Sequence, residues 1–158
     1  MAGVTLLWRA LSTAGAKPVG VAALEAFRMA EGIPMYGRDI AERDLPQETS
    51  QTRALHFSKG CYLGQEIVER IRSRGNVHRH LRQLELQGPL PNPGTELLLD
   101  GAQVGHITSS SELPLDGGFR RFALAMVRSE AETKNQPLTY MTASAAGTAN
   151  LLNHPPAL

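Results

Sequence analysis

The chain has 158 residues, of which 42% are hydrophobic and 20% are charged, and its formal net charge at pH 7 is +1. This composition predicts a soluble globular protein with room for one domain or two small ones. A membrane-spanning helix is excluded, because no stretch approaches the roughly 20 consecutive apolar residues that such a helix needs.

The cysteine content indicates the redox environment of the protein, and the lysine content indicates which basic groups would bind an anion. Cys61 is the single cysteine, so the chain forms no internal disulfide, and no charged segment followed by an apolar one opens the sequence. We therefore expect a reducing, cytoplasmic environment. Only three of the 16 basic residues are lysines, so a bound anion would mostly meet guanidinium groups.

The first half of the chain is predicted to be mainly helical. Apolar residues at helical spacing, each run ended by a glycine, predict helices over residues 5–14, 21–31 and 65–74. In the third helix we expect Ile67, Val68 and Ile71 to point inward. Residues 33–52 are rich in proline, glycine and charge and predict a long surface loop, and residues 53–57 predict a short strand.

The second half changes to alternating hydrophobicity with recurrent turn residues, which indicates an all-β region. Strands are expected over residues 81–86, 95–99, 102–108, 119–128, 138–143 and 148–152, closing a small antiparallel barrel. The predicted fold class is therefore α+β, with a partial α/β domain over residues 1–77 and a barrel over residues 78–158. Because one strand is too little sheet for three helices, we also expect part of the first domain to be missing upstream.

Cys61 lies in a glycine-flanked turn that opens the third predicted helix. Unpaired amide groups at a helix N-terminus favour the thiolate, and Lys59 would act in the same direction. Gly60 and Gly64 allow the turn to present the thiol to a cleft. The alternative is a buried structural cysteine, since free cysteines are among the most buried residues.

Two acids of the long loop, Asp39 and Glu48, could bind an amino-heterocycle such as a pterin, whose parallel N–H donors match a carboxylate. The alternative is that both are simply solvated. A basic run between Arg70 and Arg82 could meet phosphates, RNA or carboxylates, or it could be a solvated surface. The histidines do not have the spacing of metal ligands, so no metal site is predicted.

The segment Lys-Gly-Cys-Tyr-Leu-Gly-Gln-Glu at residues 59–66 resembles the signature of the YgfZ family, folate-binding relatives of the glycine-cleavage T protein. Residues 27–39, 45–48 and 104–109 are similar to other stretches of that family. The resemblance covers about residues 4–153. It implies the later portion of a three-domain folate-binding architecture, in which two α/β domains and a C-terminal barrel surround an opening for tetrahydrofolate.

The resemblance also implies roles for particular residues. Cys61 and Lys59 match the functional residues of the signature, and Glu48 matches an acidic position that holds the pterin. Weaker correspondences to cofactor-binding positions are Tyr36, Arg28 and Asp39. Expected partners are folate, client iron–sulfur proteins and, through a link to tRNA modification, tRNA.

Three functions remain open at this stage. The first is a tetrahydrofolate-binding factor that supports iron–sulfur cluster assembly or repair, with Cys61 as a reactive thiol. The second is an aminomethyltransferase that uses tetrahydrofolate, although T proteins lack the cysteine signature. The third is an RNA-binding module that uses the arginine run. The sequence does not specify an oligomeric state or whether there is catalytic turnover.

Overall fold

The computed structural model describes residues 2–75, 77–115 and 117–156. Its helical elements are α1 (Ala2–Thr13), α2 (Val21–Ala30), the short 3-10 helix η1 (Thr52–Ala54), α3 (Gln65–Arg74) and α4 (Ser129–Lys134). Its strands are β1 (Arg79–Gln87), β2 (Glu96–Leu99), β3 (Ala102–Leu115), β4 (Gly118–Arg128), β5 (Leu138–Met141) and β6 (Ala146–Leu151). Asn76, at the predicted boundary between the halves, lies outside the described residues.

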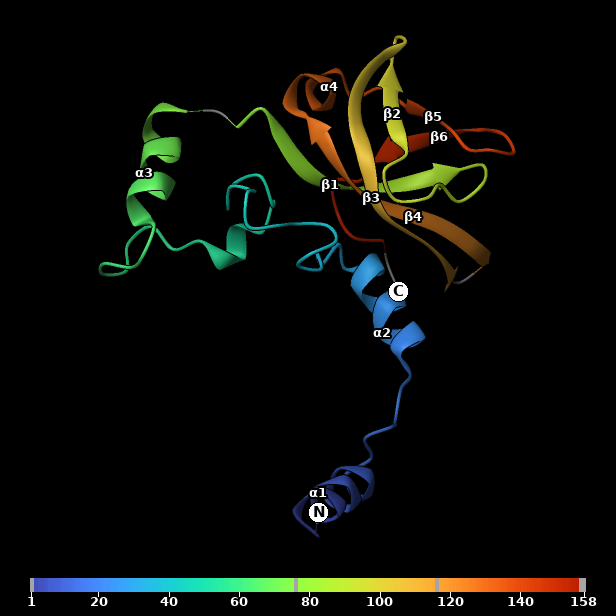
Figure 1. Ribbon diagram of the computed structural model, residues 1–158. Coiled ribbons are helices and arrows are strands. Elements are labelled where there is room, and N and C mark those ends of the chain that lie inside the picture. The colour runs from blue at the N-terminus through green and yellow to red at the C-terminus, as the bar shows by residue number, and fades with distance from the viewer. Residues whose placement is uncertain (1, 76, 116, 157–158) are drawn as a thin grey trace.

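The six strands form a closed antiparallel barrel in the order β1-β4-β3-β2-β5-β6 (Figure 1). The long hairpin of β3 and β4 supplies the largest part of the wall, and β1 pairs with β4 along nearly its whole length. Pairing of β1 with β6, with Leu84 opposite Leu151, closes the barrel. The α+β fold class and the antiparallel barrel predicted from the sequence are therefore confirmed.

Strand β4 is buried on both faces, which explains its continuous apolar sequence. Ala123, Ala125 and Val127 point into the barrel, where small side chains suit the narrow interior. Phe122, Leu124 and Met126 alternate with them and pack outside the barrel against Met29 and Ala30 at the end of α2. This second cluster fixes α2 and the following loop against the barrel wall.

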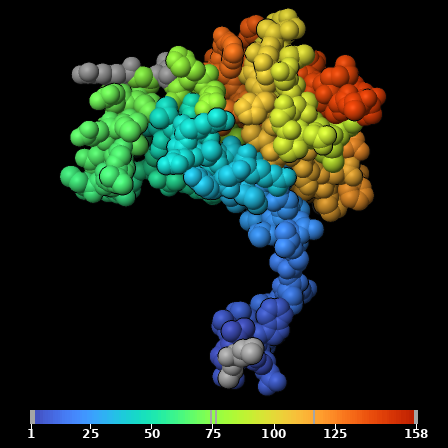
Figure 2. All heavy atoms as spheres, viewed as in Figure 1, coloured from blue at the N-terminus to red at the C-terminus, as the bar shows by residue number. Residues whose placement is uncertain are grey.

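The other long helices contribute little to this core. α1 lies away from the barrel, beyond residues 14–20 (Figures 1 and 2). Its apolar side chains, including Trp8 at 58% exposure, face solvent. α3 also stands apart from the barrel (Figure 1). Within residues 65–73 of α3, Val68 is the one buried residue, whereas Ile67 is 53% exposed. The expectation that its apolar side chains all point inward was wrong, because no sheet lies beneath this helix in the described chain.

Two elements differ from the sequence-based expectation. The strand predicted over residues 53–57 is wrong: this segment begins in η1 and continues as bends, with no neighbouring strand to pair with among the described residues. The helix α4, which links β4 to β5, was not predicted. None of the helices in the described ranges combines the length and the hydropathy that a membrane span requires.

Candidate functional site

The long loop between α2 and η1 is fixed to the barrel by Asp39. Its Oδ1 accepts hydrogen bonds from the hydroxyl groups of Thr108 and Ser109 on β3, both at 2.6 Å. Its Oδ2 accepts from Nη1 of Arg28 at 2.6 Å and from the backbone N–H of Met35 at 2.9 Å. The carboxylate is fully buried. Asp39 thus joins α2, the loop and the barrel at one point.

The guanidinium group of Arg28, like the carboxylate of Asp39, makes its hydrogen bonds within the chain. Besides Asp39, its guanidinium donates to Ser109 Oγ at 3.1 Å, to the carbonyl of Ile33 at 3.0 Å and to the carboxylate of Glu25. The hydrogen bond with Glu25 and the charge of Asp39 raise the pKa of Arg28 and outweigh its burial. The structure therefore brings Arg28 and Asp39 together as a buried ion pair whose polar atoms already have partners.

Glu48 anchors the other end of the loop, to strand β1. Its Oε1 accepts from Nε of Arg79 at 2.9 Å, and its Oε2 accepts from the N–H of Leu45 at 3.0 Å. Arg79 also donates to Asp44, at 3.0 Å. The backbone carbonyl of Glu48 accepts from the N–H of Leu81 at 2.7 Å. Both carboxylate oxygens of Glu48 are thus engaged within the chain.

The environment of Glu48 predicts that the free energy of unfolding decreases at acid pH. Burial acts to raise its pKa, but hydrogen bonds from Arg79 and Leu45 hold the pKa below the usual value of a glutamate side chain. The contribution of Glu48 to stability is therefore complete above that value and is lost as the pH falls through the lower folded-state pKa. We expect Glu48→Gln to lower the free energy of unfolding by about 2 kcal/mol at neutral pH and by less in acid.

Urea denaturation of wild type and Glu48→Gln at neutral pH and below pH 4 measures this difference. Glu96→Gln, on the exposed side of β2, is the matched control and should show no such pH dependence. A difference between Glu48→Gln and wild type that stays constant across this range would contradict the ion-paired carboxylate.

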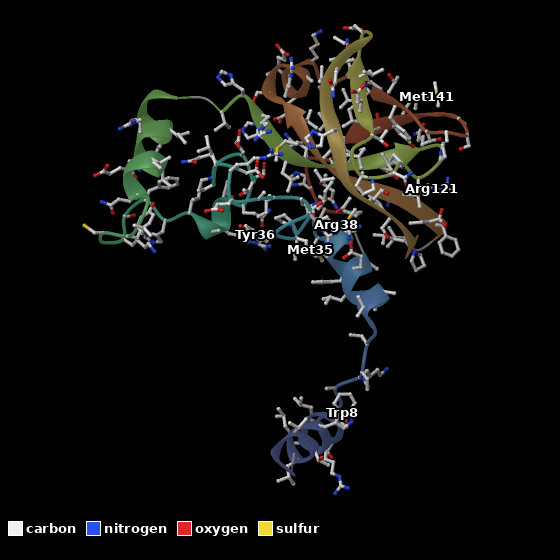
Figure 3. All side chains as sticks on the ribbon, viewed as in Figure 1. Trp8, Met35, Tyr36, Arg38, Arg121 and Met141 are labelled. Atoms are coloured by element: carbon white, nitrogen blue, oxygen red, sulfur yellow. The ribbon has the colours of Figure 1, made fainter. Side chains whose placement is uncertain are left out.

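Tyr36 lies at the surface of the loop, with 70% of its area exposed. Met35 and Arg38, close by, are also exposed (Figure 3). Arg38 donates to Glu25 at 3.0 Å and so connects this surface to the network of Arg28. The ring of Tyr36, one of the six predicted site residues, is therefore available to an external ligand or partner.

Cys61 is exposed in the turn that precedes α3. Gly64 adopts φ 86°, a left-handed conformation that favours glycine, and the side chain of Gln65 accepts from the N–H of Tyr62 at 3.1 Å. The ammonium group of Lys59 lies 4.6 Å from the centroid of the Tyr62 ring. The turn is thus locally ordered and presents the thiol to solvent, on an arm separate from the buried Arg28–Asp39 pair.

Two cavities border the loop. The first, of about 410 Å³, lies between the loop and the Cys61 turn and is lined mainly by apolar side chains, among them Leu45, Leu55, Tyr62 and Val68. The second, of about 480 Å³, lies between the loop and strand β1 and has a more polar wall. Both volumes fall within the range that suits a small-molecule ligand, roughly 300–1,000 Å³.

Comparison with known proteins identifies the family to which the barrel belongs. Residues 78–156 match the family described as CAF17, C-terminal beta-barrel domain. The chain belongs to this family. The matched segment contains all six strands and α4, so every barrel contact of Asp39 and Glu48 described above is made to the CAF17-type barrel.

Several curated relatives extend the similarity beyond the barrel. The chain is 34% identical over 134 residues to an aminomethyltransferase of Nostoc sp., covering 84% of this chain and 35% of the relative. It is 35% identical over 125 residues to an aminomethyltransferase of Thermus thermophilus, with coverages of 78% and 33%. It is 28% identical over 137 residues to a putative chloroplastic transferase of Arabidopsis thaliana, with coverages of 87% and 31%. The chain thus spans about a third of the length of these relatives.

A solved structure has the same fold as the CAF17-type chain. The glycine cleavage system aminomethyltransferase T of Bartonella henselae matches 98% of this chain and 43% of its own, with a TM-score of 0.80 at 19% sequence identity. This likeness concerns the fold alone. Together, the CAF17 barrel and the aminomethyltransferase relatives place the chain in the superfamily of glycine-cleavage T-like proteins.

Several residues that organise the site were not singled out from the sequence. Arg79, the partner of Glu48, was considered only as part of a basic run. In that run Arg79, His80 and Arg82 all contact acids, the last two sharing Glu132 at 3.0 Å each. The side chain of Arg74, in the same run, is not among those that the structure describes. Thr108 and Ser109 fall in a family-like stretch, which was a signal for their position but not for their bond to Asp39.

Proposed function

We propose that this protein is a YgfZ-like, tetrahydrofolate-binding factor that supports proteins with iron–sulfur clusters. The observation that carries the proposal is the exposed thiol of Cys61, held in an ordered turn before α3. An exposed thiol contributes little to folding, so its place in an eight-residue family-like signature favours a chemical role. In the proposal Cys61 contacts the client cluster or metal, and Lys59 sits beside it.

The folate part of the proposal rests on the superfamily and on the loop. Relatives named aminomethyltransferases share about 34% identity with much of this chain, and tetrahydrofolate is the cofactor of that reaction. The loop provides two cavities of suitable volume and an exposed aromatic ring at Tyr36. Since both oxygens of Glu48 are engaged, we assign Glu48, Asp39 and Arg28 the task of positioning the loop.

Replacing the thiol tests the proposal. We expect Cys61→Ser to leave the free energy of unfolding within about 0.5 kcal/mol of wild type, because an exposed side chain makes few contacts. In cells that lack their own relative of this protein, the variant should fail to restore the activity of a [4Fe–4S] dehydratase that wild type restores.

Ser58→Ala is the control for this experiment, since it alters the same exposed segment and keeps the thiol. It should complement as wild type does. Full complementation by Cys61→Ser would contradict the proposed role of the thiol.

An aminomethyltransferase is the second candidate, favoured by the names of the curated relatives. It predicts transfer of a methylene group from an aminomethylated lipoyl carrier to tetrahydrofolate, with ammonia released, and no dependence on Cys61. An assay of that transfer with wild type and Cys61→Ser separates the two candidates.

An RNA-binding role gains little support, because Arg72, Arg79 and Arg82 each contact a carboxylate within the chain.

A further inference from the structure

The barrel places two arginines directly opposite each other at one end of the β1–β4 pairing. Arg79 begins β1 and Arg128 ends β4, and the two residues are partners in the register of these antiparallel strands. Like charges at directly opposite positions destabilise a sheet. A negative charge beside this pair is therefore favourable.

The chain supplies such a charge to Arg79 but little of it to Arg128. Nε and Nη2 of Arg79 donate to Glu48 and Asp44, whose side chains are only 10% and 8% exposed. Arg128 makes no side-chain hydrogen bond within the described part of the chain, and Oε1 of Glu130 lies 3.5 Å from its Nη1. The guanidinium group of Arg128 and Nη1 of Arg79 thus remain available as donors.

A cavity of about 180 Å³ lies beside this arginine pair. Both arginines line it, together with Gln103, Gly105 and His106 of β3, because β4 lies between β1 and β3 in the barrel (Figure 1). Its volume suits one small anion with a few water molecules, since a water molecule occupies about 30 Å³ in the liquid. Side chains from three adjacent strands therefore offer N–H donors around one small space.

Arginine charges also make the electrostatic potential at His106 positive. Burial lowers the pKa of the half-buried His106 ring, and the charges of Arg79 and Arg43 lower it further. Asp44 acts in the opposite direction, with a smaller effect. The ring is therefore uncharged at neutral pH and keeps one N–H donor, while the arginines supply the positive charge.

A larger cavity adjoins the small one. It has a volume of about 650 Å³ and is lined by Val77, His78 and Ser129 as well as by Arg79 and Arg128. Because the two arginines line both cavities, a group attached to an anion in the small cavity has room in the larger one. Neither cavity shares a lining residue with the two cavities beside the loop.

We propose that the small cavity binds the phosphate group of a phosphomonoester, with the guanidinium of Arg128, Nη1 of Arg79 and the ring N–H of His106 as donors. Guanidinium groups form strong, charge-assisted hydrogen bonds with phosphate oxygens. Donors on three strands also suit a tetrahedral anion better than a planar carboxylate. The organic part of the ligand lies in the 650 Å³ cavity, and the site is independent of the proposed function.

Titration of the full chain with inorganic phosphate and with methyl phosphate at constant ionic strength, followed by NMR, tests the site. We expect saturable amide shifts at Gln103, Gly105 and His106, with a dissociation constant on the order of 1–10 mM. The pKa of the His106 ring should rise when phosphate is bound, because a nearby anion stabilises the imidazolium. His154, exposed beyond β6, is the internal control and should keep its pKa.

Two substitutions should change the affinity in opposite directions. Arg128→Gln should weaken phosphate binding about 10-fold or more, because it removes a charged donor. Glu130→Gln should strengthen binding about two- to fivefold, because it removes the carboxylate that competes for Arg128. Arg9→Gln, which removes the same charge from the exposed face of α1, should bind as wild type does. Unchanged circular dichroism and Tm establish that each variant folds.

Three results would overturn the proposal. The first is equal affinity of wild type and Arg128→Gln for phosphate. The second is the absence of saturable shifts at the cavity at concentrations well above the expected dissociation constant, including the case in which other basic residues respond instead. The third is binding of dimethyl phosphate, a phosphodiester with one charge, or of acetate as tightly as methyl phosphate, which would exclude recognition of a phosphomonoester.

Discussion

Replacing Asp39 by Asn should lower the free energy of unfolding by about 3 kcal/mol, because the buried guanidinium of Arg28 then loses one of its two carboxylate partners and retains that of Glu25. The side-chain volume is unchanged, so the effect reports the lost charge and the lost acceptor Oδ2, in whose place an amide N–H group faces the donors of Arg28 and Met35. Urea denaturation followed by circular dichroism measures it. The loop over residues 33–52 should also become more susceptible to proteolysis, since Asp39 is its main attachment to β3.

The control for this variant is Asp100→Asn, which makes the same chemical change at an exposed position that forms a surface ion pair with Lys134. Asp100 has φ 54°, which asparagine tolerates, so backbone strain is not added. Its effect should stay within about 0.5 kcal/mol. If Asp39→Asn is no more destabilising than Asp100→Asn, the buried network does not hold the loop.

A methyl group at Gly105 should also destabilise the barrel strongly. Gly105 lies opposite Val127 in the β3–β4 pairing and opposite Leu97 in the β2–β3 pairing. A Cβ atom there would overlap the carbonyl oxygen of Met126 and lie 3.2 Å from Cα of Val127. Because these are backbone atoms of a paired strand, they cannot rotate aside, and we expect Gly105→Ala to cost about 3 kcal/mol.

Thermal and urea unfolding of Gly105→Ala measure that cost, with Gly20→Ala as the control. Gly20 lies at the N-cap of α2, with φ −85°, and a methyl group added there would meet no atom within 4 Å. Its substitution should cost no more than about 1 kcal/mol, because alanine is a poorer N-cap residue than glycine but meets no steric overlap there. Wild-type stability of Gly105→Ala would show that β3 and β4 are not packed as closely as described.

The barrel could be predicted from the sequence because its strands carry alternating apolar residues between glycine-rich turns. The prediction ended β3 at Thr108, since polar residues follow, whereas pairing with β4 continues to Leu115. Residues 53–57 have the composition of a strand but no neighbouring strand in the described chain, and composition alone does not reveal whether a partner exists.

The candidate site was less predictable, because its contacts join residues distant in sequence. The acids at positions 39 and 48 were recognised as important, but their partners could not be deduced from local patterns. Asp39 meets hydroxyl groups 69 and 70 residues away, and Glu48 meets an arginine 31 residues away.

Direct titration calorimetry of tetrahydrofolate into the wild-type chain tests the central claim. We predict saturable, one-to-one binding that is weak, with a dissociation constant on the order of 1 mM, because the cavities beside the loop are open to solvent and a partly enclosed ring gains little beyond the cost of association. Heats that stay at the level of ligand dilution up to the solubility limit of tetrahydrofolate would contradict it.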